Sequence, residues 1–129
     1  MTEDIKKLYD LALAAMKNAH CPISNYKVGA AVETTDGELY AGCNVETIAF
    51  TTSTHAETNA IDTAVTHGMK GLRRVLVITN EKVPVFSCAL CRQRIIEFGK
   101  DTEIIASNLT GDIRILNIAE LYPEPFVAY

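Results

Sequence analysis

The stretch that decides the fold is RRVLVIT, residues 73–79, in the second half of a 129-residue chain. Its uninterrupted apolar run, 75–78, is bounded by two arginines and a threonine. A short continuous run of this kind is typical of a strand at the centre of a sheet, where both faces are buried. The stretch therefore predicts a sheet that helices cover on its faces.

The segments on both sides of this strand alternate between helical and strand patterns. Apolar residues recur at helical spacing in 3–19 and 56–68, and a third helix is expected from Ser87 or Cys88 to Phe98, with Ser87 as its N-cap and Gly99 at its C′ position. The remaining predicted elements are a hairpin over 28–45 with its turn at 35–38, strands at 103–107 and 112–116, and a final short helix at 118–121. This order predicts an α/β fold: one domain over 1–129, a three-layer α/β/α sandwich with a mixed sheet of about five strands.

Composition narrows the class of protein and of partner. With 48% hydrophobic and 22% charged residues, the chain is expected to be globular and not disordered. Twelve Lys and Arg against sixteen Asp and Glu give a net charge of −4 with no basic stripe, which favours a weakly charged small molecule over nucleic acid or an anionic membrane. The sequence has no signal-peptide pattern at its start and no apolar run near the roughly 18 residues of a membrane helix, so a cytoplasmic location is expected.

Cytosolic thiols stay reduced, so the four cysteines need an explanation other than structural disulfides. Cys88 and Cys91 form a Cys-x-x-Cys pair at an expected helix start, where the helix dipole favours thiolates. This spacing suits a metal site, a redox pair or two buried structural residues, and by itself does not choose among them. Cys21 and Cys43 have no partner at ligand spacing and are expected to be packing residues.

A second motif, His55-Ala56-Glu57, lies at the start of the preceding helix. Parallel strands would bring both helix starts to one edge of the sheet, so that His55 could meet Cys88 and Cys91 there. Three ligands leave a tetrahedral zinc ion one position for water, toward which Glu57 would point. The same residues, with Thr54, also fit a capping box, in which Glu57 would merely bind the helix start.

Several stretches together resemble the cytidine deaminase family. They are 28–31, 42–46, 55–61 with its His-x-Glu motif, 88–93 with its Cys-x-x-Cys motif, and the ending 120–126. His-x-Glu followed by Cys-x-x-Cys is the signature of zinc-dependent deaminases. The resemblance implies one zinc ion per subunit, held by His55, Cys88 and Cys91, with Glu57 as the catalytic acid and base. It implies hydrolytic deamination of cytidine or deoxycytidine to the uracil nucleoside and ammonia.

The resemblance also implies the substrate contacts. Asn44 and Glu46 match residues that hydrogen-bond the ribose, and Tyr26 stands where the family usually has a phenylalanine beside the base. Phe126 matches an aromatic residue that closes over the nucleoside, often in a neighbouring subunit. A homotetramer is therefore expected.

Some positions depart from the family pattern. Small members commonly have Cys at the position of His55 and Arg at that of Thr58; two thiolates and a neutral histidine balance Zn²⁺ without the arginine. Ser87 and Ala89 replace Pro and Gly, and 47–52 also differs. These changes leave open which substituents on the base the pocket accepts. The alternatives are a deaminase of a modified cytosine compound such as blasticidin S and, in another class, a non-catalytic zinc-stabilised or thiol-redox module.

Overall fold

A single mixed sheet of five strands organises the structure, a computed structural model that describes residues 1–127. The strands are β1 (Val28–Thr34), β2 (Leu39–Cys43), β3 (Leu72–Thr79), β4 (Glu103–Asn108) and β5 (Ile113–Asn117). Their order across the sheet is β2-β1-β3-β4-β5, so β3 is the central strand. Its residues from Val75 to Thr79 are all buried, as the apolar run predicted.

The strand directions decide where the following helices begin. β1 pairs antiparallel with β2 on one side and with β3 on the other. β2 and β3 therefore run in the same direction, although they are not neighbours. β3 pairs parallel with β4, and β5 returns antiparallel to β4. The segments that leave β2 and β3 emerge at the same edge of the sheet.

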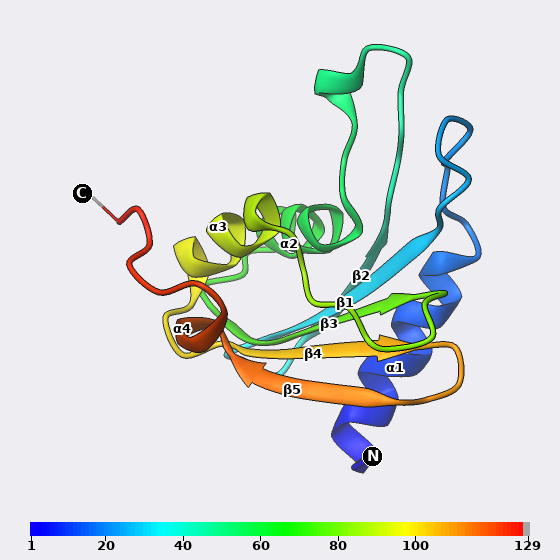
Figure 1. Cartoon of the computed structure of the whole chain (residues 1–129). Coiled ribbons are helices and arrows are strands. Elements are labelled where there is room, and N and C mark those ends of the chain that lie inside the picture. The colour runs from blue at the N-terminus through cyan, green and yellow to red at the C-terminus, as the bar shows by residue number, and fades with distance from the viewer. Residues whose placement is uncertain (128–129) are drawn as a thin grey trace.

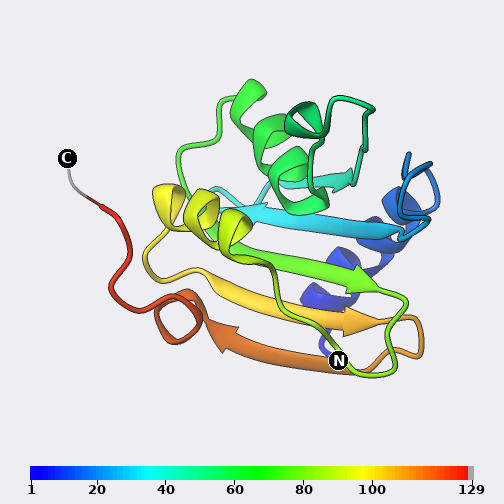
Figure 2. The same ribbon diagram turned by 45° about the horizontal axis from the view of Figure 1, so that its top comes forward.

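Helices cover both faces of the sheet (Figures 1 and 2). The helices are α1 (Glu3–Met16), α2 (Ala56–Thr66), α3 (Ala89–Phe98) and α4 (Ile118–Leu121). A 3₁₀ turn, η1 (Phe50–Thr52), lies on the exposed loop between β2 and α2. α1 packs on one face through a core that includes Leu8, Leu76 and Ile105. α2 and α3 pack on the other face. The predicted three-layer α/β/α sandwich is confirmed, and within residues 1–127 no helix combines the length and apolarity needed to cross a membrane.

The first helix is shorter than its periodicity predicts. It ends at Met16, not at residue 19. The chain leaves the helix because His20 pairs with the segment after β2: its N–H donates to the carbonyl of Asn44 at 3.0 Å, and its carbonyl accepts from the N–H of Glu46 at 2.7 Å. A long-range backbone pairing thus replaces the last turn of the helix.

Both predicted caps of α3 are wrong. The N-cap is Cys88, whose carbonyl accepts the N–H of Arg92 at 2.9 Å, so Ser87 lies outside the helix. Gly99 has an extended backbone (φ −170°) instead of the left-handed conformation of a C′ glycine. Glycine is needed there for space, because a Cβ atom would lie 2.7 Å from the carbonyl oxygen of Leu72.

A second close approach joins α2 to the sheet. A Cβ atom on Gly42 of β2 would clash with the backbone N of Ala60 and would lie 2.7 Å from the backbone O of Ala56. Backbone atoms of a helix cannot move aside as a flexible side chain can. Gly42 therefore allows the first turns of α2, which carry His55 and Glu57, to rest directly on the strand.

We predict that Gly42→Ala lowers the free energy of unfolding by about 3 kcal/mol or more, since overpacking here must displace a helix. Chemical denaturation monitored by circular dichroism measures the change. Gly71→Ala is the matched control, because its new Cβ would lie 3.1 Å or more from its nearest neighbours, the first of which is a side-chain methyl group. Equal stability losses in the two variants would contradict the prediction.

Candidate active site

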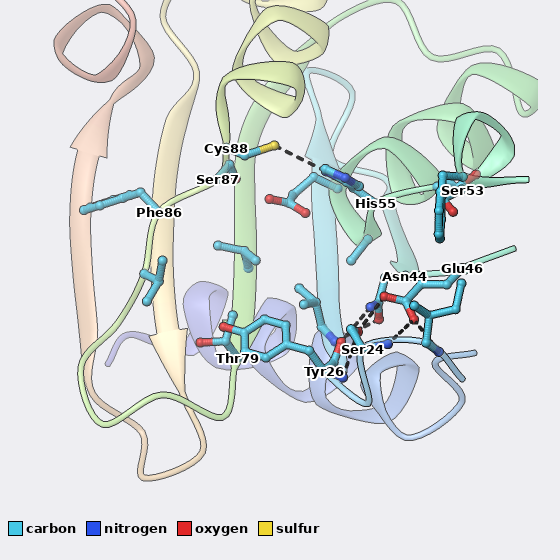
Figure 3. A pocket seen from close by; sticks show the side chains of 18 residues that line it. Ser24, Tyr26, Asn44, Glu46, Ser53, His55, Thr79, Phe86, Ser87 and Cys88 are labelled. Carbon is cyan, nitrogen blue, oxygen red and sulfur yellow. Dashed lines mark hydrogen bonds between the residues drawn. The ribbon is translucent and has the colours of Figure 1, made fainter. Parts of the chain in front are cut away.

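Three potential metal ligands meet where α2 and α3 begin. His55 is the N-cap of α2, Cys88 is the N-cap of α3, and Cys91 follows in the first turn of α3. The Nδ1 atom of His55 lies 3.3 Å from each of the two sulfur atoms, and the sulfurs lie 3.7 Å apart. Figure 3 shows the side chain of Cys88 directed at the imidazole of His55.

These separations fit one tetrahedral zinc ion. Zn–S bonds of about 2.3 Å and Zn–N bonds of about 2.0–2.1 Å at tetrahedral angles place two sulfurs about 3.8 Å apart and nitrogen and sulfur about 3.6 Å apart. Three ligands leave a fourth position open, as in catalytic zinc sites. Two thiolates and a neutral imidazole also cancel the ion's charge, so no further cation is needed in the site.

Burial distinguishes the two thiols. Cys88 is exposed, whereas Cys91 is fully buried behind it. Burial, followed by the negative charges of Glu57 and Cys88, raises the pKa of the Cys91 thiol far above its ordinary value. A cation among these groups would supply the charge that stabilises the thiolate. The donor set is therefore better suited to a bound metal ion than to three unliganded side chains.

Glu57 lies in the first turn of α2 and is only 5% exposed. The capping-box alternative is wrong, because the N-cap is His55, not Thr54, and the helix start has no side-chain cap hydrogen bond. Glu57 instead lines a cavity next to the metal-ligating group. Its carboxylate is thus not used to cap the helix and lies beside Cys91 and the other metal-ligating residues.

The cavity has a volume of about 580 Å³, enough for a nucleoside. Its lining comes from β1 and the segment before it, from the segment after β2, from the end of β3 and the segment after it, and from the start of α2. The lining residues include Ser24, Tyr26, Asn44, Glu46, Phe50, His55, Glu57, Thr79, Ser87 and Cys88. Figure 3 shows His55, Ser87 and Cys88 at one end, with Tyr26, Asn44 and Glu46 at the other.

Asn44 holds the wall of this cavity in place. It is buried; its Oδ1 accepts from the N–H of Val28 at 2.9 Å, and its Nδ2 donates to the carbonyl of Tyr26 at 2.7 Å. The second N–H of the Asn44 side-chain amide takes part in neither of these bonds. Asn44 therefore has a positioning role that the sequence did not reveal, besides any contact with a ligand.

Glu46 is held by a residue that the sequence reasoning missed. Its Oε1 accepts the N–H groups of Ile23 and Ser24 at 3.2 and 3.0 Å, and its Oε2 accepts the Ser24 hydroxyl at 2.5 Å. The Ser24 hydroxyl and amide lower the pKa of the Glu46 carboxyl, which keeps it ionised. Nearby, burial raises the pKa of Tyr26. No local motif around Ser24 signals this pairing, which spans 22 residues.

Phe126 lies apart from the cavity of its own chain. Its side chain is 71% exposed and is not among the cavity-lining residues, while its carbonyl accepts from Nε2 of Gln93 at 2.9 Å.

Cys21 is buried and Cys43 half-buried, and neither belongs to the metal-ligating group. The structure thus brings together six of the eight predicted site residues around the cavity, with Cys91 directly behind it and Phe126 elsewhere.

The fold and the site together define a class of protein. A sheet covered on both faces presents a three-ligand metal group, a buried carboxylate and an open cavity large enough for a small molecule. An open zinc position beside a carboxylate is the arrangement of zinc enzymes that activate water. The class is that of zinc-dependent hydrolytic enzymes.

Comparisons with known proteins identify the family. Residues 2–107 match the cytidine and deoxycytidylate deaminase zinc-binding region. The chain is 36% identical over 124 residues to a cytidine deaminase of Sporosarcina psychrophila, covering 95% of this chain and 91% of the relative, and 33% identical to one of Halalkalibacterium halodurans, covering 97% and 96%. The crystal structure of cytidine deaminase from Burkholderia pseudomallei superimposes with a TM-score of 0.90 at 35% identity, covering 98% of this chain and all of that one. The chain belongs to the cytidine deaminase family.

We predict that Cys88→Ala lowers the zinc content from about one ion per chain to below about a tenth, because two ligands hold zinc much more weakly than three. Elemental analysis of the purified protein measures this content. The control is Cys43→Ala, which removes a thiol outside the metal-ligating group and retains zinc. Zinc at the wild-type level in Cys88→Ala would contradict the ligand assignment.

Proposed function

We propose that the protein catalyses the zinc-dependent hydrolysis of cytidine and deoxycytidine to uridine and deoxyuridine, with release of ammonia. The observation that carries this proposal is the buried carboxylate of Glu57 beside His55, Cys88 and Cys91 in a nucleoside-sized cavity. The relatives named cytidine deaminase, which align over nearly the whole chain, support the choice of substrate.

Glu57 moves the protons in the proposed reaction. A zinc ion held by His55, Cys88 and Cys91 would supply a water whose pKa is lowered toward neutrality. Glu57 accepts a proton from this water and transfers it to ring N3, which makes C4 electrophilic. A C4–O bond forms, and Glu57 then takes the second proton from the new C4 hydroxyl and gives it to the amine as the C4–N bond breaks. Both protons of water are thus placed, one on N3 and one on ammonia, so that water and cytidine balance uridine and ammonia.

The other end of the cavity binds the sugar in this proposal. The ionised Glu46 is an acceptor for ribose hydroxyls, and Ser24 holds it in one orientation. The spare N–H of Asn44 donates to the same sugar. Tyr26 forms an aromatic wall beside the base. Contacts at the metal end and at the sugar end of the cavity then hold the nucleoside so that C4 of the base faces Glu57.

We predict that Glu57→Gln retains one zinc ion per chain but lowers kcat by at least about 10²–10⁴-fold, since the amide cannot shuttle protons. Ammonia release and the ultraviolet change are followed with a panel of cytidine, deoxycytidine and blasticidin S. Glu97→Gln, which changes an exposed carboxylate on α3, serves as the control and keeps full activity.

The same assay separates the competing functions. Wild-type turnover of blasticidin S well above that of cytidine would replace the proposed substrate with a modified cytosine compound. Zinc without deamination of any compound would indicate a non-catalytic zinc module. A cycling Cys88–Cys91 disulfide without zinc would indicate a redox protein.

We propose that the enzyme acts on free nucleosides in the cytoplasm. The net charge of −4 disfavours binding to a polynucleotide, which normally requires a positive face. All four cysteines are free thiols, which suits a reducing compartment. Salt-dependent binding to RNA or DNA would contradict the choice of a free nucleoside.

We also propose a homotetramer in which Phe126 reaches the cavity of a neighbouring subunit. Several large apolar side chains are exposed in the single chain. They include Phe50 on the cavity wall, Leu90 between Cys88 and Cys91, Ile48 and Phe126. Their burial between subunits would stabilise the assembly.

We predict by light scattering a mass four times the 14.1 kDa of one chain. Phe126→Ala should raise KM more than it lowers kcat, because the residue would cover the nucleoside without touching the reacting atoms. A monomeric wild-type protein would contradict the assembly and leave the zinc chemistry in place.

A further inference from the structure

Two buried hydroxyl groups line the cavity without a hydrogen-bond partner. They are Oγ of Ser87 and Oγ1 of Thr79, the two buried side-chain oxygens or nitrogens between residues 1 and 127 that have no partner. The residues are 3% and 4% exposed. An unpaired buried hydroxyl costs free energy, so two of them on one cavity point to ligand atoms that complete their bonding.

The two hydroxyls belong to opposite ends of the cavity. Ser87 directly precedes Cys88 and lies at the metal end, whereas Thr79 ends β3 and lies beside Tyr26 (Figure 3). If C4 of the base faces Glu57, as the proposed function requires, the exocyclic amine of cytosine lies at the Ser87 end. That amine carries two N–H donors, and a serine oxygen can accept one of them.

The backbone carbonyl of Ser87 already has a hydrogen-bond partner. It accepts from Nε of Arg92 at 2.6 Å, and Nη1 of Arg92 in turn donates to the carbonyl of Leu121 at 2.8 Å. The hydroxyl is the side-chain group of Ser87 left to bind a ligand, and rotation about χ1 moves it among three staggered positions. Proline, which the family pattern has at this position, offers no such hydroxyl.

We infer that Ser87 is a specificity-determining residue whose hydroxyl accepts a hydrogen bond from the 4-amino group of the bound cytosine. This inference rests on the proposed function and adds a contact that selects an amine at C4. After deamination the hydroxyl rotates to donate to the 4-oxo group of the product, because a hydroxyl both donates and accepts.

The test compares two nucleosides that differ at C4, cytidine and pyrimidin-2-one riboside, which has hydrogen in place of the amine. Their Kd values are measured by calorimetry in the inactive Glu57→Gln protein, with and without Ser87→Ala. Ser87→Ala should weaken cytidine binding about fivefold, the net effect of one hydrogen bond, and change binding of the pyrimidinone less than about twofold. The matched control, Thr79→Val, removes the other unpaired hydroxyl and should change both Kd values by the same factor.

Thermal unfolding of the free proteins gives a readout independent of binding. Ser87→Ala should unfold at a temperature equal to or above that of its parent, because it removes an unsatisfied group. Ser107→Ala, whose hydroxyl donates to the carbonyl of Val77 at 2.9 Å, should unfold at a lower temperature. A lower unfolding temperature for Ser87→Ala, or equal effects of this substitution on the two nucleosides, would overturn the inference. Absence of cytidine turnover by the wild-type enzyme would instead overturn the proposed function.

Discussion

The site depends on β1 being the shared antiparallel neighbour of β2 and β3. This pairing makes β2 and β3 point the same way, so the helices that follow them, α2 and α3, begin at one edge of the sheet. His55 and Cys88 occupy the N-cap positions of those helices, which is why their ligand atoms lie 3.3 Å apart although 33 residues separate them. Gly42 lets α2 lie close enough to the sheet for this alignment.

The electrostatics of the site follow from this convergence. Two helix N-termini bring unpaired N–H groups and positive dipole ends to a point where thiolates and a carboxylate are gathered. The burial that raises the pKa of Cys91 also excludes water from Glu57 beside it. Buried negative charges are unfavourable by themselves, so a bound cation and the positive ends of the two helices would offset the charges of the thiolates and the carboxylate. A metal ion bound here would therefore neutralise negative charge next to two buried side chains, Cys91 and Glu57.

Sequence patterns predicted those elements whose signals are local. The apolar run 75–78 became the central strand, and the hairpin turn fell between β1 and β2. The residues His55, Cys88 and Cys91 also meet as expected, but that expectation came from the predicted strand directions and not from a local signal. The failures lie where distant segments compete with local preference. Helix α1 ends early because His20 pairs with the chain after β2, and Gly99 is required by the packing of Leu72 instead of by a left-handed turn.

The sequence by itself determined the order of helices and strands, the ligand types and the charge balance of the metal group, because these are properties of neighbouring residues and of composition. Only the tertiary structure decided that Nδ1 of His55 faces both sulfurs, that Ser24 holds Glu46, and that the Ser87 hydroxyl is left unpaired on the cavity wall. These facts arise from contacts between segments far apart in the chain, whose geometry is set by how the helices pack on the sheet and not by any local pattern.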